Sequence, residues 1–190
     1  MPTDPATPDQ RLVRKMTHYM AWANGVMLDS VARLPAEEIT RERPTLFGNL
    51  AHTFNHILVV ADIFRSHLEG RPHGYTARNT DTAPPFEELR AKLEAMDRHY
   101  VALAARLSQE ELDEVVRFTF VGGGKGAMTR LEILLHLVNH ATYHRGFISD
   151  MLYQLPVPAP RESNDLSVFL RDAWPKIQAK LDGESAGESA

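Results

Sequence analysis

The chain of 190 residues carries 21 Lys and Arg, 25 Asp and Glu, nine His and no Cys, which gives a net charge of −4. This length is typical of one domain whose core needs no disulfide, and the lack of Cys excludes thiolate metal sites and cysteine nucleophiles. The negative charge argues against a broad nucleic-acid surface, and the lack of a long apolar run argues against a membrane span. Because the N-terminal residues MPTDPATPDQ do not form a secretion signal, we expect a cytoplasmic protein.

Three segments with helical periodicity follow one another in the first part of the chain. Residues 1–8 contain three Pro and predict a disordered lead-in. Apolar residues then recur every three or four positions, which predicts helices over 9–34, 46–68 and 85–107. The segment 71–85 is rich in Gly, Pro, Thr and Asn and predicts a loop.

A different pattern precedes the fourth helix. Strand-forming residues over 115–120 and the glycines of 122–126 predict a short hairpin or an extended loop. This glycine run lacks the spacing of a phosphate-binding P-loop. Thr129 and Glu132 match a capping box, so we expect the fourth helix to begin there and to continue to about Tyr153.

The C-terminal part predicts a short helix over 164–181, with a break before Pro175, and a disordered tail over 183–190. Four long amphipathic helices with short connections indicate an all-α fold, a four-helix bundle. We therefore predict one bundle domain over 9–182, with the hairpin or extended loop before its fourth helix and the short helix at its C-terminal end.

Five of the nine histidines lie in two clusters. The second predicted helix carries His52 and His56, and the fourth carries His136, His140 and His144. Neighbouring members of each cluster are four residues apart, which places their rings on one face of a helix.

The surroundings of these histidines predict that they point into the bundle. His140 and His144 share a helix face with apolar residues, namely Ile133, Leu137, Phe147 and Met151. His56 lies among Val59, Val60 and Ile63. Burial disfavours charged imidazole, so these rings are expected to be neutral near pH 7, the form that binds metals.

Two histidines at i and i+4 and a third from a facing helix provide three nitrogen ligands. We predict that His56, His140 and His144 bind one divalent metal and leave a position open for water or substrate, as in catalytic zinc sites. Zinc fits imidazole ligation best, whereas nickel, iron and manganese bind similar sites. His52 and His136 each lie one turn from a ligand, so we expect them to support the site through hydrogen bonds or to act as proton acceptors.

The same pattern has plainer interpretations. A buried His is most often a packed and hydrogen-bonded core residue, in which case the bundle would be an interaction module without a metal. A di-iron carboxylate site is disfavoured because it needs inward Glu residues and Glu-x-x-His motifs, which the histidine stripe lacks.

Several other residues have ordinary structural interpretations. Four histidines have no partner at metal-ligand spacing: His18, His67, His73 and His99. We expect Tyr19 and Trp22 to pack in the core rather than to stack on a ligand. We interpret Arg145 as a surface ion-pair residue, the alternative being an anion site near the metal.

Three segments of the chain together resemble the DinB/YfiT family: YMAWAN (19–24), GNLAHTFNHILVVAD (48–62) and HLVNHATYHRG (136–146). The resemblance extends over about residues 12–172. It implies a four-helix bundle, often dimeric, with one divalent metal held by three histidines, which correspond by position to His56, His140 and His144.

The chain also departs from the family pattern near these histidines. Phe147 stands where members often have Gln, Tyr143 where they often have a second His, and a Trp that is frequent in the family is absent near Phe64. None of these differences removes a ligand. Phe147 makes the site less polar, so the substrates of relatives do not transfer directly to this chain.

Members of the wider superfamily include transferases and isomerases that use low-molecular-weight thiols such as mycothiol or bacillithiol, and the damage-inducible name of the family reflects induction. The first hypothesis is therefore a metal-dependent enzyme that transfers a thiolate to an electrophile, or a hydrolase if water is the nucleophile. The second is a non-enzymatic metal-binding stress-response protein. We also expect a homodimer that binds a small-molecule substrate or thiol, with the first or third helix at the dimer interface.

Overall fold

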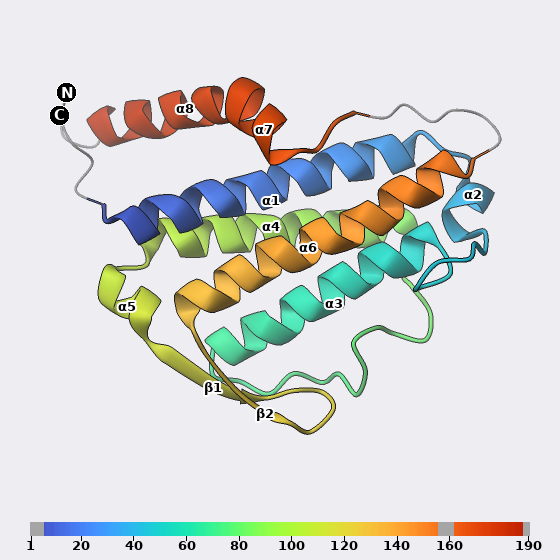
Figure 1. The fold of residues 1–190 in the computed structure, drawn as a ribbon, viewed down its shortest axis with the longest axis horizontal. Coiled ribbons are helices and arrows are strands. Elements are labelled where there is room, and N and C mark those ends of the chain that lie inside the picture. Colours follow the sequence, from blue (N-terminus) through green and yellow to red (C-terminus); the bar gives the residue numbers. More distant parts are fainter. Residues whose placement is uncertain (1–5, 156–161, 188–190) are drawn as a thin grey trace.

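The computed structural model describes residues 6–155 and 162–187. Its main body consists of four long helices that pack side by side (Figure 1). They are α1 (Pro8–Ala32), α3 (Leu50–Leu68), α4 (Phe86–Arg106) and α6 (Arg130–Tyr153). The predicted all-α four-helix bundle is therefore confirmed.

A long crossover loop distinguishes the topology of this bundle. The chain leaves α3, runs back along the bundle through residues 69–85 and then enters α4, so α3 and α4 run in the same direction (Figure 1). The predicted loop 71–85 lies within this crossover. Because the loop passes along α3, it can contribute groups to the side of that helix.

The first helix begins one residue earlier than its pattern predicted. Thr7 accepts a hydrogen bond from the Gln10 backbone, the Gln10 side chain accepts one from the Thr7 backbone, and Pro8 occupies the first helical position. This capping box is the reason that the end of the predicted lead-in belongs to the fold. Residues 1–5 lie outside the described part of the chain.

The segment before α3 forms a short helix and a turn. The helix α2 (Ala36–Thr40) was not predicted. Residues 46–49 were expected to be helical but lie before the start of α3. Gly48 has φ +76, a conformation that favours glycine, and Asn49 then caps α3 by accepting a hydrogen bond from the His52 backbone. A helix start at 46 is thus prevented by Gly48, and α3 begins at Leu50.

The predicted hairpin is confirmed and precedes α6. After the short helix α5 (Gln109–Asp113), which was not predicted, the strands β1 (Val115–Thr119) and β2 (Lys125–Thr129) pair antiparallel, with Phe118 opposite Gly126. A Cβ at Gly126 would lie 2.5 Å from the Phe118 ring, so only glycine allows this packing. Thr129 caps α6 with Glu132 in the predicted capping box.

The C-terminal segment packs across α1 (Figure 1). It consists of α7 (Leu166–Val168), the π-helical turn η1 (Phe169–Ala173) and α8 (Trp174–Gly187). The π turn ends at Ala173, two residues before Pro175, whose ring nitrogen cannot donate a helical hydrogen bond, so the helix changes close to the predicted break. The helix extends to Gly187, beyond the predicted end at 181, whereas residues 188–190 lie outside the described part.

Phe169 attaches this segment to the bundle. Its side chain is fully buried and contacts the rings of Tyr19 and Trp22 at centroid distances of 5.6 and 5.5 Å. Tyr19 is buried and Trp22 packs against the core, as predicted. Within 6–155 and 162–187, no helix has both the length and the apolarity needed to cross a membrane.

Candidate metal centre

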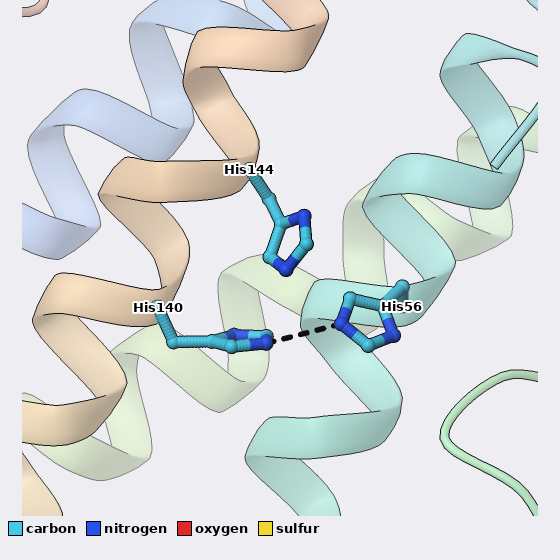
Figure 2. Close-up of side chains that lie close together, drawn as sticks. All are labelled: His56, His140 and His144. Carbon is cyan, nitrogen blue, oxygen red and sulfur yellow. Dashed lines mark hydrogen bonds between the residues drawn. The ribbon is translucent and has the colours of Figure 1, made fainter. Parts of the chain in front are cut away.

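Three histidines from two facing helices converge near the middle of the bundle (Figure 2). His56 comes from α3, and His140 and His144 come from successive turns of α6. A ligand nitrogen of each lies within 4.8 Å of those of the other two, and the Nε2 atom of His56 is hydrogen-bonded to that of His140 at 3.0 Å. The structure therefore brings together the three residues that the sequence predicted as metal ligands.

The packing of α3 against α6 determines this convergence. Helix α3 is buried on most of its surface, so His56 projects from a helix that is enclosed by its neighbours. On α6, His140 and His144 are one turn apart, and their ring centroids are separated by 4.5 Å. His56 and His144 are buried, and His140 is half-buried.

The crossover loop determines which nitrogen of His56 is free. His56 Nδ1 donates a hydrogen bond to the backbone carbonyl of Arg78 at 2.6 Å, and Phe47 stacks on the ring at a centroid distance of 4.3 Å. With its proton on Nδ1, the ring presents the lone pair of Nε2 to His140 and His144 (Figure 2). A backbone carbonyl that orients a metal-binding histidine in this way is a common feature of metal sites.

The electrostatic environment keeps the three rings neutral. Burial, together with a smaller contribution from neighbouring imidazoles, lowers the pKa of His140 to about 3 and that of His144 to about 4. Burial also lowers the pKa of His56. The hydrogen bond to the Arg78 carbonyl opposes this effect, and the charge of Arg78 adds to it. Neutral imidazole is the ligand form, so the chemistry of this donor set fits a divalent cation.

The distances between the donors fit such an ion as well. Zinc–nitrogen bonds are about 2.0–2.1 Å long, so two ligands of a tetrahedral site lie roughly 3.3 Å apart. The separation of 3.0 Å between His56 Nε2 and His140 Nε2 is close to this value. Among the described residues, no other group of three or more His, Asp or Glu is arranged to hold a metal.

The two predicted supporting histidines differ in their relation to this triad. The His136 ring lies 5.7 Å from that of His140 and 4.8 Å from that of Phe64, so it adjoins the site. His52 contributes backbone groups, which bond to Asn49 and Asn79, and within the described residues its ring makes no contact with the triad. Of the two, only His136 has a ring next to a triad member.

The interpretation of Arg145 as a surface residue is wrong. Its side chain is only 1% exposed, and its guanidinium donates to Asn24 Oδ1 at 2.8 Å and to Thr142 Oγ1 at 2.7 Å. It also lies over the Tyr19 ring, 5.3 Å from the centroid. Arg145 follows Ala141 by four residues, so both lie on the same side of α6, and both are buried. This spacing indicates burial of Arg145 from the sequence alone.

Asn24 connects Arg145 to a buried carboxyl group that sequence analysis missed. Asn24 Nδ2 donates to both carboxyl oxygens of Asp97, at 3.0 and 3.1 Å. Burial raises the pKa of Asp97 to about 7, and the hydrogen bonds from Asn24 and the charge of Arg145 oppose this rise. The network joins α1, α4 and α6, and its Arg145 directly follows His144 in the chain.

The remaining four histidines lie outside the triad. His18 packs on Trp174, and His99 packs on Tyr100. His67 stacks on Phe118 of the hairpin and also contacts His73. These rings pack against neighbouring aromatic side chains.

The lowered pKa values predict how the metal-free protein responds to acid. NMR titration should show the imidazoles of His140 and His144 still neutral at about pH 5, where an ordinary histidine is protonated. Because their folded pKa values lie below the unfolded value, they stabilise the fold fully above about pH 6.5, and this contribution is lost as the pH falls from there toward 3. The acid-unfolded protein is the control, and titration of both rings near pH 6.5 in the folded state would contradict the structure.

The fold and the site together define a class of protein: a helical bundle in which three histidines from two facing helices form a candidate metal centre. The model of the DinB family matches residues 4–163, so the chain belongs to the DinB family. The chain is also similar to Protein DinB of Bacillus subtilis, with 27% identity over 167 residues, which cover 82% of this chain and 93% of that protein.

A solved structure supports the fold. The chain resembles the crystal structure of a DinB-like protein from Bacillus cereus with a TM-score of 0.59 and 20% identity, over 77% of this chain and 92% of that one. Membership of the family agrees with the resemblance found in the sequence.

Proposed function

We propose that the protein binds one divalent metal, preferably zinc, through His56, His140 and His144. We further propose that it is a metal-dependent enzyme. The observation that carries this proposal is the convergence of three neutral imidazoles, one of them held in the ligand tautomer by the Arg78 carbonyl. Three protein ligands are typical of catalytic zinc sites, which keep a position for water or substrate.

The reaction we propose is the transfer of a low-molecular-weight thiol to an electrophile. A divalent metal bound at the triad supplies Lewis acidity, which lowers the pKa of a coordinating thiol or water. The sulfur–carbon bond forms as the bond to the leaving group breaks, the leaving group departs with the electron pair, and the thiol proton passes to solvent.

The residues around the triad favour a thiol over water as the nucleophile. Among the described residues, the side chains that converge at the site are three histidines and no carboxylate. Hydrolysis usually needs a general base to activate water, whereas a thiol is already much more acidic. Phe47 and half-buried Phe147 pack against His144, which makes this side of the site apolar.

Metal analysis tests the first part of this proposal. Purified protein dialysed against zinc is expected to contain about one equivalent of metal, and His140→Ala should lower the zinc affinity at least about 100-fold, because two imidazoles remain. His99→Ala, which removes an imidazole from α4 away from the triad, is the matched control. An unchanged metal content in His140→Ala would contradict the assignment of the ligands.

A turnover assay tests the second part. The zinc-loaded protein is incubated with a set of low-molecular-weight thiols and an aryl halide electrophile, and formation of the thioether is followed by mass spectrometry. We expect turnover that is lost in His140→Ala and retained in His99→Ala. Metal binding without turnover for any thiol would favour a non-enzymatic binding protein, and turnover without thiol would favour a hydrolase.

We also propose that the protein acts as a homodimer. The C-terminal segment covers part of α1, which was one of the two helices considered for the interface. The other helix considered is α4. Because the C-terminal segment does not cover the exposed face of α4, this face fits the interface better than α1.

A further inference from the structure

A pocket of about 540 Å³ lies next to the triad, and the proposed chemistry does not yet use it. Its walls come from three parts of the fold: Val60, Ile63, Phe64 and His67 of α3, residues 76–78 of the crossover loop, and residues 120–122 of the hairpin turn. This volume is within the range of small-molecule binding pockets, about 300–1,000 Å³.

The pocket adjoins the triad along α3. Val60 follows His56 by one helical turn on the same face. Phe64 contacts His136, and the His136 ring is 5.7 Å from that of His140. Arg78 lines the pocket, and its backbone carbonyl holds His56. A ligand in this pocket would therefore lie one helical turn from His56 along α3, although no triad residue is part of the pocket walls.

The walls combine an apolar surface with a positive charge. Aliphatic and aromatic side chains dominate, and Phe120 at the hairpin end is 48% exposed and presents its ring. Arg78 is exposed, and its guanidinium makes no ion pair or hydrogen bond within the residues that the structure describes. The Arg78 backbone carbonyl is 2.6 Å from His56 Nδ1, so this arginine is anchored next to the triad.

We propose that this pocket binds a small organic carboxylate, with its apolar or aromatic body against Val60, Phe64 and Phe120 and its anionic group on Arg78. An apolar body alone would leave the cation without a partner, and an arginine is well suited to carboxylate recognition. The claim that this carboxylate is a substrate rests on the proposed function. The claim that it binds does not, because the pocket residues are distinct from the triad and binding here does not need the metal.

The test compares two ligands with the same apolar body, one ending in a carboxylate and the other in a neutral alcohol. Phenylbutyrate and phenylbutanol are titrated into metal-free protein, and binding is measured by calorimetry and by NMR. The carboxylate is expected to bind more tightly than the alcohol. Arg78→Gln should weaken the carboxylate at least about fivefold and leave the alcohol within about twofold, because one charge-assisted hydrogen-bonded pair is lost.

Arg117→Gln is the matched control for this substitution. Arg117 is an exposed arginine on β1, outside the pocket walls, and its replacement makes the same change in net charge. Because the hydrogen bond to His56 uses the Arg78 backbone, Arg78→Gln leaves that bond possible. Equal weakening by both variants, or no weakening by Arg78→Gln, would overturn anion recognition by Arg78.

A second variant tests the place of binding. Val121→Trp should fill the half-buried edge of the pocket and weaken both ligands about tenfold, whereas Gly74→Trp, at an exposed position with open space around it, should change neither. Binding that Val121→Trp leaves intact, or no binding to the unmodified protein, would overturn the proposal. Zinc affinity is measured on the same samples: zinc binding without ligand binding overturns only this inference, and ligand binding without zinc binding overturns only the proposed metal centre.

Discussion

Zinc at about a thousandfold excess over its dissociation constant should raise the free energy of unfolding by about 4 kcal/mol. The physical reason is that the three donors converge only in the folded bundle, because His56 is 84 residues from His140 in the chain. Urea unfolding with and without zinc measures the effect. In His140→Ala the gain at the same zinc concentration should fall to about 1.4 kcal/mol or less, since an affinity about 100-fold lower leaves only about a tenfold excess.

The same variant should fold well without metal. His140 is half-buried, and its removal loses one hydrogen bond, between its Nε2 and His56 Nε2, which is a modest cost of about 1 kcal/mol. His99→Ala should retain the full stabilisation by zinc and serves as the control. An equal gain in His140→Ala would mean that zinc stabilises the protein from another site.

Replacing Arg145 by Met should destabilise the protein by about 3–5 kcal/mol, the usual cost of removing one charged partner from a buried network. Met retains much of the length of the side chain, so the effect reports the lost charge and hydrogen bonds rather than a large cavity. Asn24 Oδ1 would lose its donor, and Asp97 would lose the positive charge that opposes its neutralisation. Chemical denaturation of the variant and of the unmodified protein measures the difference.

The pH dependence of this loss identifies its cause. The folded pKa of Asp97, about 7, lies above its unfolded value, so the associated stability is present at low pH and is lost as the pH rises through 7. Without Arg145 this pKa rises further, and Arg145→Met should therefore be most harmful above pH 7 and milder near pH 5. Arg117→Met, at the exposed surface, should stay within about 0.5 kcal/mol at both pH values, and a pH-independent loss would speak against Asp97.

Periodicity and capping residues were sufficient to predict the main elements of the fold. The four long helices follow from apolar residues at spacings of three and four, and the start of α6 follows from Thr129 and Glu132. The triad was predictable for a related reason: His140 and His144 are one turn apart on an apolar face, and His56 occupies a similar face on a helix expected to pack nearby.

Contacts between distant segments could not be predicted in the same way. The Arg78 carbonyl that holds His56 comes from a loop without periodicity, 22 residues away. The partners of Arg145 are distant as well, since Asn24 is 121 residues away. Periodicity indicates that a side chain is buried, but it does not indicate which polar group from another helix satisfies it.

The division between helices and loops has a consequence for how such proteins diversify. Residues 56, 140 and 144 sit on helices that the whole core holds in place, whereas much of the adjoining pocket is built from the crossover loop and the hairpin turn. Mutations in those two connections can accumulate at little cost in stability, because connections tolerate change better than packed helices. One candidate metal centre could thus be combined with new ligand preferences, and sequence differences among relatives are expected to concentrate at 76–78 and 120–122.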